Sequence, residues 1–147
     1  MSAEREREFE ELLGFLDFHS EHLRKNPVAA PAGLTIRTVA ERIAQEHGRS
    51  KALEGARQAT NDALEELADL TREGVTVVDE ALRAAGLVSL SELRRRYSSA
   101  FQRILRRGSI KTETEYYLVN GLVVDLTSSL TVPERERLQA MVSAYEG

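Results

Sequence analysis

The chain has 147 residues, of which 41% are hydrophobic and 30% charged, and its net charge is −4. This length predicts a single domain with its own core, and the composition excludes a disordered chain. The chain has no cysteine, which excludes disulfides, thiolate metal sites and cysteine nucleophiles. The charged N-terminus lacks an apolar signal segment, and no apolar run is long enough to span a membrane, so we expect a cytoplasmic protein.

The first predicted helix covers residues 2–25. Ser2 is a suitable N-cap, and acidic residues follow in the first turn, where the helix dipole favours them. Apolar residues then recur at helical spacing as far as Leu23. Asn26-Pro27 predicts the end of this helix, and residues 27–34 form a connector rich in proline, alanine and glycine.

Three further helices are expected before residue 86. The second runs from about Ile36 to His47 and ends at Gly48. The third runs from Ser50 to about Arg72 and is followed by Gly74, and a short helix covers 77–85.

The next predicted helix, within residues 89–107, is basic. Residues 91–111 contain seven Lys or Arg and one acid, Glu92, although the whole chain is acidic. At 3.6 residues per turn the arginines gather opposite the apolar residues, with Arg94 at the border. We interpret the resulting basic face as a surface for carboxylates or phosphates; it consists of Arg95, Arg96, Arg103, Arg106 and Arg107.

An acidic strip is predicted on the third helix. Its members lie three or four residues apart and repel one another, so a cationic partner would stabilise them. They are Asp62, Glu65, Glu66, Asp69 and Glu73.

Residues 112–126 allow two interpretations. Thr112 and Glu115 match a capping box and predict a helix, whereas Asn120-Gly121 between apolar runs is typical of a β-hairpin. We favour the helix, because an isolated hairpin is only marginally stable. The last helix is marked by Thr131, Pro133 and Glu134, and Leu138, Met141, Val142 and Tyr145 form its apolar face.

The sequence therefore predicts an all-α, single-domain bundle of about five to seven helices over residues 1–147. The alternative is an α+β fold with a small hairpin at 112–126. The N-terminal helix 2–25, joined by the connector 27–34, is the only segment with a linker-like junction.

For the function, we expect a non-enzymatic module for protein–protein interaction or regulation. Its partner is another protein or a second copy of itself, bound through the complementary basic and acidic faces. The alternative is a small nucleic-acid-associated regulator that uses the arginine-rich helix. Its support is weaker, because nucleic-acid-binding domains are usually basic overall and the aromatic residues Tyr97 and Phe101 lie on the buried arc. A membrane partner is not expected, because the apolar arc is needed for the core.

A third alternative is an enzyme. Asp62-x-x-Glu65 and Glu66-x-x-Asp69 loosely resemble the acidic motifs of all-α nucleotide pyrophosphohydrolases, and this resemblance implies Mg²⁺-dependent chemistry. The chain departs from that pattern, since no second acidic pair follows at a compatible spacing. His19 and His22 are interpreted as surface histidines. The sequence predicts no catalytic residue, metal site or cofactor.

Overall fold

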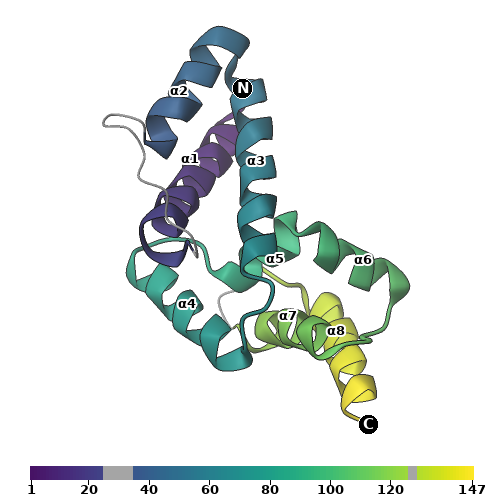
Figure 1. The fold of residues 1–147 in the computed structure, drawn as a ribbon. Helices are drawn as coiled ribbons and strands as arrows, with labels where there is room; N and C mark the ends of the chain where they lie inside the picture. Colours follow the sequence, from purple (N-terminus) through teal and green to yellow (C-terminus); the bar gives the residue numbers. More distant parts are fainter. Residues whose placement is uncertain (25–34, 126–128) are drawn as a thin grey trace. The chain divides into compact units, whose positions relative to one another are not determined.

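A computed structural model describes residues 1–24, 35–125 and 129–147. In these ranges the chain forms eight α-helices, one π-helical turn and no strand (Figure 1). The predicted all-α class is confirmed, with slightly more helices than expected. The connector predicted at 27–34 lies outside the described residues.

The chain divides into two compact units, Met1–Glu66 and Leu67–Gly147. The grouping of both units into one domain stays a prediction. The first unit carries nine Lys or Arg against 13 Asp or Glu, a net charge of −4, whereas the second carries 11 of each and is neutral.

Unit 1 consists of α1 (Ala3–Phe18), the π-helical turn η1 (His19–Leu23), α2 (Ile36–His47) and α3 (Arg49–Glu66). Ser2 caps α1 as predicted, its hydroxyl accepting a hydrogen bond from the Arg5 N–H at 3.3 Å. Both α1 and α2 pack against α3, and their core is apolar. It contains Phe9, Leu12, Leu13, Phe15 and Leu16 of α1, Ala40 of α2, and Ala52, Leu53, Ala56, Ala63 and Leu64 of α3.

Unit 2 consists of α4 (Arg72–Ala84), α5 (Leu90–Tyr97), α6 (Ser99–Arg107), α7 (Glu113–Val124) and α8 (Val132–Glu146). Helix α7 packs against α4, α5, α6 and α8 and is therefore central to this unit. The core between α6, α7 and α8 is apolar. Thr131 and Glu134 form the predicted capping box of α8, with Pro133 in its first turn.

Two predicted helices are shorter in the structure than the sequence suggested. Helix α3 ends at Glu66 rather than near Arg72, because the hydroxyl of Thr71 accepts from the Gly74 N–H at 3.1 Å and starts α4. The basic helix breaks at Ser98, whose backbone is extended and whose hydroxyl accepts from the Phe101 N–H at 3.1 Å. Both breaks occur where a hydroxyl caps a new helix, and the break at Ser98 accounts for the one additional helix.

Residues 113–124 are helical, so the hairpin alternative is wrong. Thr112 caps α7 by accepting from the Glu115 N–H at 3.2 Å. Gly121 lies inside the helix and does not adopt a positive φ angle. A Cβ atom there would lie 3.2 Å from Ser91 Oγ and 3.3 Å from Val75 Cγ1. The glycine thus allows close packing of α7 rather than a turn.

No helix in the described ranges is long and apolar enough to cross a membrane.

Candidate functional site

The predicted basic face is divided between α5 and α6, and its arginines are in two different states. Arg95 donates to both carboxylate oxygens of Glu92 at 2.8 and 2.7 Å, and Arg96 donates to the same carboxylate at 3.0 Å. Arg107 pairs with Glu115. Arg103 and Arg106 are exposed and pair with no acid among the described residues. Only part of the predicted face is therefore available to an external anion.

Arg103 and Arg106 lie three residues apart on α6, so they point to the same side of the helix. The opposite side is buried through Phe101 and Ile104. The backbone of α6 is well supported, because Gly108 ends it in the left-handed conformation with φ 78°. Arg137 of α8 donates to the Leu105 carbonyl at 2.7 Å and adds a cation near that end.

The acidic strip does not form one helical surface. Asp62, Glu65 and Glu66 lie on α3, Asp69 lies in the turn after it, and Glu73 lies in the first turn of α4. The strip was predicted on the assumption that the third helix continued to Arg72, and the Thr71 cap removes that assumption. That the acids on α3, in the turn and on α4 act as interaction surfaces stays a prediction.

Glu66 has a partner that the sequence did not suggest. His19 Nε2 lies 3.6 Å from Glu66 Oε2. His19 is only 7% exposed, so its interpretation as a surface histidine is wrong. Burial lowers the pKa of His19, and the charge of Glu66 acts in the opposite direction. The π-helical turn that begins at His19 is a feature often found at functional positions.

Unit 2 contains a cluster of buried polar side chains between α4, α5 and α7. Asp79 of α4 accepts hydrogen bonds from the Ser91 N–H at 3.1 Å and the Ser91 hydroxyl at 2.8 Å. Burial raises the pKa of Asp79, although these hydrogen bonds act to lower it. Asp125, which follows α7, accepts from the Ser89 hydroxyl at 2.6 Å and from Arg83 at 2.9 Å. These bonds join the three helices through their interior.

Arg94 is the largest side chain in this cluster and is 1% exposed. Its Nη2 donates to the Leu67 carbonyl at 2.9 Å, whereas its Nε has no hydrogen-bond partner among the described residues. Burial lowers the pKa of Arg94 to about 10, while the charge of Asp79 acts to raise it. Arg94 is thus a buried cation at neutral pH. The helix wheel placed Arg94 at the border of the apolar arc. A wheel does not show contacts with distant residues, and the Leu67 carbonyl that Arg94 contacts lies 27 residues away.

Glu92 lies at the edge of the cluster and orders the arginines around it. Besides Arg95 and Arg96, the Ser129 hydroxyl donates to it at 2.6 Å. Burial by itself would raise the pKa of Glu92, but the hydrogen bonds from Arg95 and Ser129 and the charges of both arginines lower it to about 2. Two of the five predicted arginines are therefore paired with one buried carboxylate of unit 2.

Unit 1 has a cleft of about 590 Å³ between α1, α2 and α3. Apolar side chains dominate its lining, including Leu13, Leu16, Val39 and Ile43, and Asp17 lies among them. Burial raises the pKa of Asp17. The cleft extends to Arg24 and Thr35, which border the residues outside the described part.

The described residues include no group of three or more His, Asp or Glu side chains placed to hold a metal ion. The acidic pairs of α3 therefore have no metal cage in that part of the chain. No family model, curated protein or solved structure matches the chain.

Proposed function

We propose that the protein is a non-enzymatic helical interaction module that binds a carboxylate-bearing protein surface through α6. The observation that carries this proposal is the difference among the five arginines of the predicted basic face. Three have acidic partners within unit 2, and Arg103 and Arg106 have none among the described residues while being exposed on one side of a short, well-capped helix. Arginine suits this role, because its planar guanidinium forms paired hydrogen bonds with a carboxylate.

A second copy of the chain is one candidate partner. Asp62 and Glu65 are exposed on α3, and unit 1 has an excess of four negative charges. Contact between α6 of one copy and α3 of another would bring together opposite charges that have no such partner within their own helices. Pairs of this kind determine orientation and partner choice more than affinity, because each exposed pair contributes only about 0–1 kcal/mol.

Nucleic acid receives less support than an acidic protein. A phosphate backbone is usually bound by many cations, and Arg95, Arg96 and Arg107 would first have to leave Glu92 and Glu115. Their departure would leave the buried carboxylate of Glu92 without counter-charges, and a buried unpaired charge is unfavourable.

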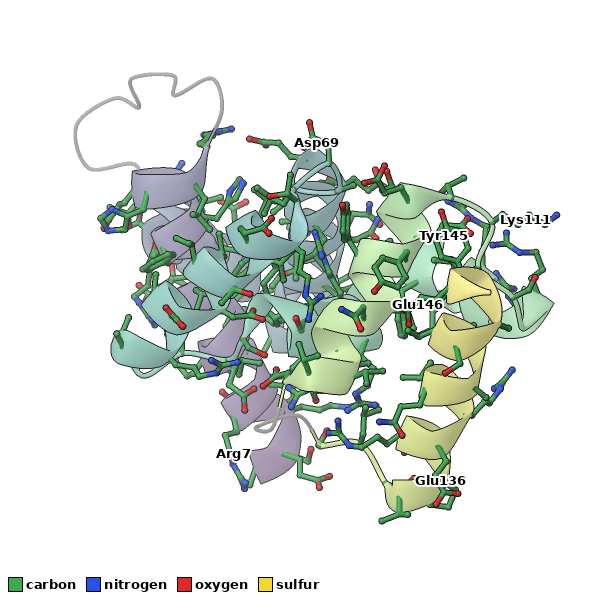
Figure 2. All side chains as sticks on the ribbon, turned by 90° about the horizontal axis from the view of Figure 1, so that it is seen from below. Arg7, Asp69, Lys111, Glu136, Tyr145 and Glu146 are labelled. Carbon is green, nitrogen blue, oxygen red and sulfur yellow. The ribbon has the colours of Figure 1, made fainter. Side chains whose placement is uncertain are left out.

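The test is binding of a glutamate-rich peptide to the full chain at low salt. We expect Arg103→Glu/Arg106→Glu to weaken binding at least about fivefold, the equivalent of about 1 kcal/mol. Arg7→Glu is a control for one reversed charge, because Arg7 is an exposed residue of α1 in the other unit (Figure 2). Equal affinity of the wild type and the double variant for the peptide would contradict the proposal.

The wild type and the double variant also distinguish a second copy of the chain from a nucleic acid as the partner. Sedimentation at low and high salt shows whether the wild-type protein self-associates and whether Arg103→Glu/Arg106→Glu prevents this. An oligonucleotide titration tests the alternative, since phosphate binding should weaken with a log–log salt slope of about −0.7 to −0.9 per phosphate contacted. Tighter binding of the oligonucleotide than of the acidic peptide would favour the nucleic-acid function instead.

A further inference from the structure

Three of the four tyrosines of the chain form one surface cluster on α7 and α8. The rings of Tyr116 and Tyr145 are stacked, with their centroids 5.5 Å apart and their planes at 28°. Tyr117 adjoins Tyr116 at 5.7 Å and 58°. Tyr145 is 39% exposed and the other two rings are half-buried. Figure 2 shows Tyr145 near the end of α8, beside Glu146. The cluster is thus partly open to solvent, mainly at Tyr145.

Carboxylates surround this tyrosine cluster. The Tyr117 hydroxyl donates to Glu113 at 2.5 Å, and the Tyr116 hydroxyl donates to Glu146 at 3.3 Å. The hydrogen bond to Glu113 raises the pKa of Tyr117, and the charge of Glu73 on α4 acts in the same direction. The acids from three helices therefore make the edge of the cluster negative.

The acids at this edge have no counter-ion within the described residues. Neither Glu113 nor Glu146 forms an ion pair with a Lys, Arg or His there; each accepts from a tyrosine hydroxyl instead. These hydrogen bonds place both carboxylates beside the tyrosine rings. The result is an aromatic surface with negative charge at its rim, a combination that attracts cations through both the ring faces and the carboxylates.

We propose that the tyrosine cluster, formed by Tyr116, Tyr117 and Tyr145, binds arginine side chains of a partner protein. A guanidinium can stack flat on a tyrosine ring while its N–H groups donate to Glu113 or Glu146. A lysine ammonium can make the second interaction but not the planar stack, so arginine is preferred. This surface is separate from Arg103 and Arg106 of α6, and the inference does not depend on the function proposed for them.

Other occupants fit this surface less well. An apolar segment would cover charged carboxylates and tyrosine hydroxyls without replacing their contacts with water, which is costly. A nucleic-acid strand could stack its bases on the rings, but its phosphates would be repelled by Glu73, Glu113 and Glu146. The charge at the rim therefore selects a cationic partner.

The experiment is a titration of the full chain with a Gly-Arg repeat peptide at low salt, followed by tyrosine fluorescence. The chain has no tryptophan, so this signal comes from its four tyrosines, of which three form the cluster. We expect saturable binding that is at least about twofold weaker for the matching Gly-Lys peptide. A glutamate-rich peptide should leave the signal of the cluster unchanged.

Two variants test the location of the binding site. Tyr145→Leu and Glu146→Gln should each weaken binding of the arginine peptide by about two- to fivefold, measured by calorimetry because the first removes a fluorophore. Glu136→Gln is the matched control, since it removes the same charge from the same helix at the end far from Tyr145 (Figure 2). It should leave the affinity unchanged.

The proposal is overturned if the arginine peptide does not bind, or if Glu136→Gln weakens binding as much as Glu146→Gln. Equal binding of the arginine and lysine peptides, unaffected by Tyr145→Leu, would reduce the effect to charge attraction and would also overturn it. Preferential binding of an uncharged Gly-Leu peptide or of a single-stranded oligonucleotide would assign the cluster to a different class of partner.

Discussion

The two units place their charged side chains differently. In unit 1 the glutamates of α1 pair on the surface with arginines of α2 and α3: Glu8 with Arg57 at 2.7 Å, Glu10 with Arg37 at 2.9 Å, and Glu6 with Arg49. In unit 2 the acids Asp79, Glu92 and Asp125 are buried and hydrogen-bonded between helices. The same residue types thus line the outside of one unit and help to build the inside of the other.

This difference indicates what holds each unit together. Surface ion pairs contribute little, so unit 1 depends on its apolar core. A buried polar group is costly unless it is hydrogen-bonded, so unit 2 requires a defined arrangement of α4, α5 and α7 in which these bonds form. We expect unit 2 to be the more sensitive to single substitutions in its interior polar residues.

The largest effect is expected for Arg94→Ala. The substitution leaves a cavity, removes the hydrogen bond to the Leu67 carbonyl and takes away the positive charge near Asp79. It should lower the free energy of unfolding by about 3 kcal/mol or more, measured by urea denaturation at pH 7.

Two comparison variants make this prediction sharper. Arg94→Met preserves most of the side-chain length without the charge and should cost clearly less than Arg94→Ala. Arg57→Ala, which breaks an exposed pair in unit 1, should change the free energy of unfolding by no more than about 1 kcal/mol. If Arg94→Ala and Arg57→Ala have similar effects, the proposed difference between the units is wrong.

Local sequence signals predicted much of the fold. Ser2, Thr112 and Thr131 were identified as caps because capping depends on residues only three positions apart. The same rule could have identified the break at Ser98 and the start of α4 after Thr71, because both hydroxyls accept from an N–H three residues later. Apolar periodicity continues across both hydroxyls, so periodicity alone favours uninterrupted helices there.

The candidate sites were less predictable, because they depend on contacts between residues far apart in the chain. Arg95 is paired because the buried carboxylate of Glu92 lies beside it, and Ser129, far along the chain, also donates to that carboxylate. Arg103 has no such neighbour among the described residues. Tyr116 and Glu146 meet only because α7 packs against α8. Helical periodicity assigns a residue to one face of a helix, but it does not state which other helix covers that face.

Two glycine-to-alanine substitutions, one in each unit, should change the free energy of unfolding by smaller amounts and in opposite directions. Gly121→Ala should destabilise the protein by about 1–2 kcal/mol, because the new Cβ meets Ser91 Oγ and Ser91 is held by Asp79. Gly55→Ala, inside α3, meets nothing within 4 Å and should stabilise it by about 0.5–1 kcal/mol through helix propensity. Thermal unfolding of the two variants beside the wild type checks both values. Stabilisation by Gly121→Ala would show that the close approach of α7 to Ser91 is not required.

The last expected effect is a pH dependence that begins at different pH values in the two units. The folded-state pKa of His19 lies below its ordinary value of 6.5, so the unfolded chain binds the proton more readily and stability falls as the pH drops below about 6.5. The pKa of Glu92 is lowered from 4.5 to about 2, so its contribution to stability is complete above pH 4.5 and is lost between those two pH values.

His19→Gln should flatten the decrease in melting temperature between pH 7 and 5.5, whereas Glu92→Gln should alter the pH dependence only below pH 4.5. Circular dichroism melts of the wild type and both variants distinguish these windows. A wild-type melting temperature that is constant from pH 7 to 5.5 would mean that His19 accepts a proton without cost, and the salt bridge with Glu66 would then have to compensate for its burial.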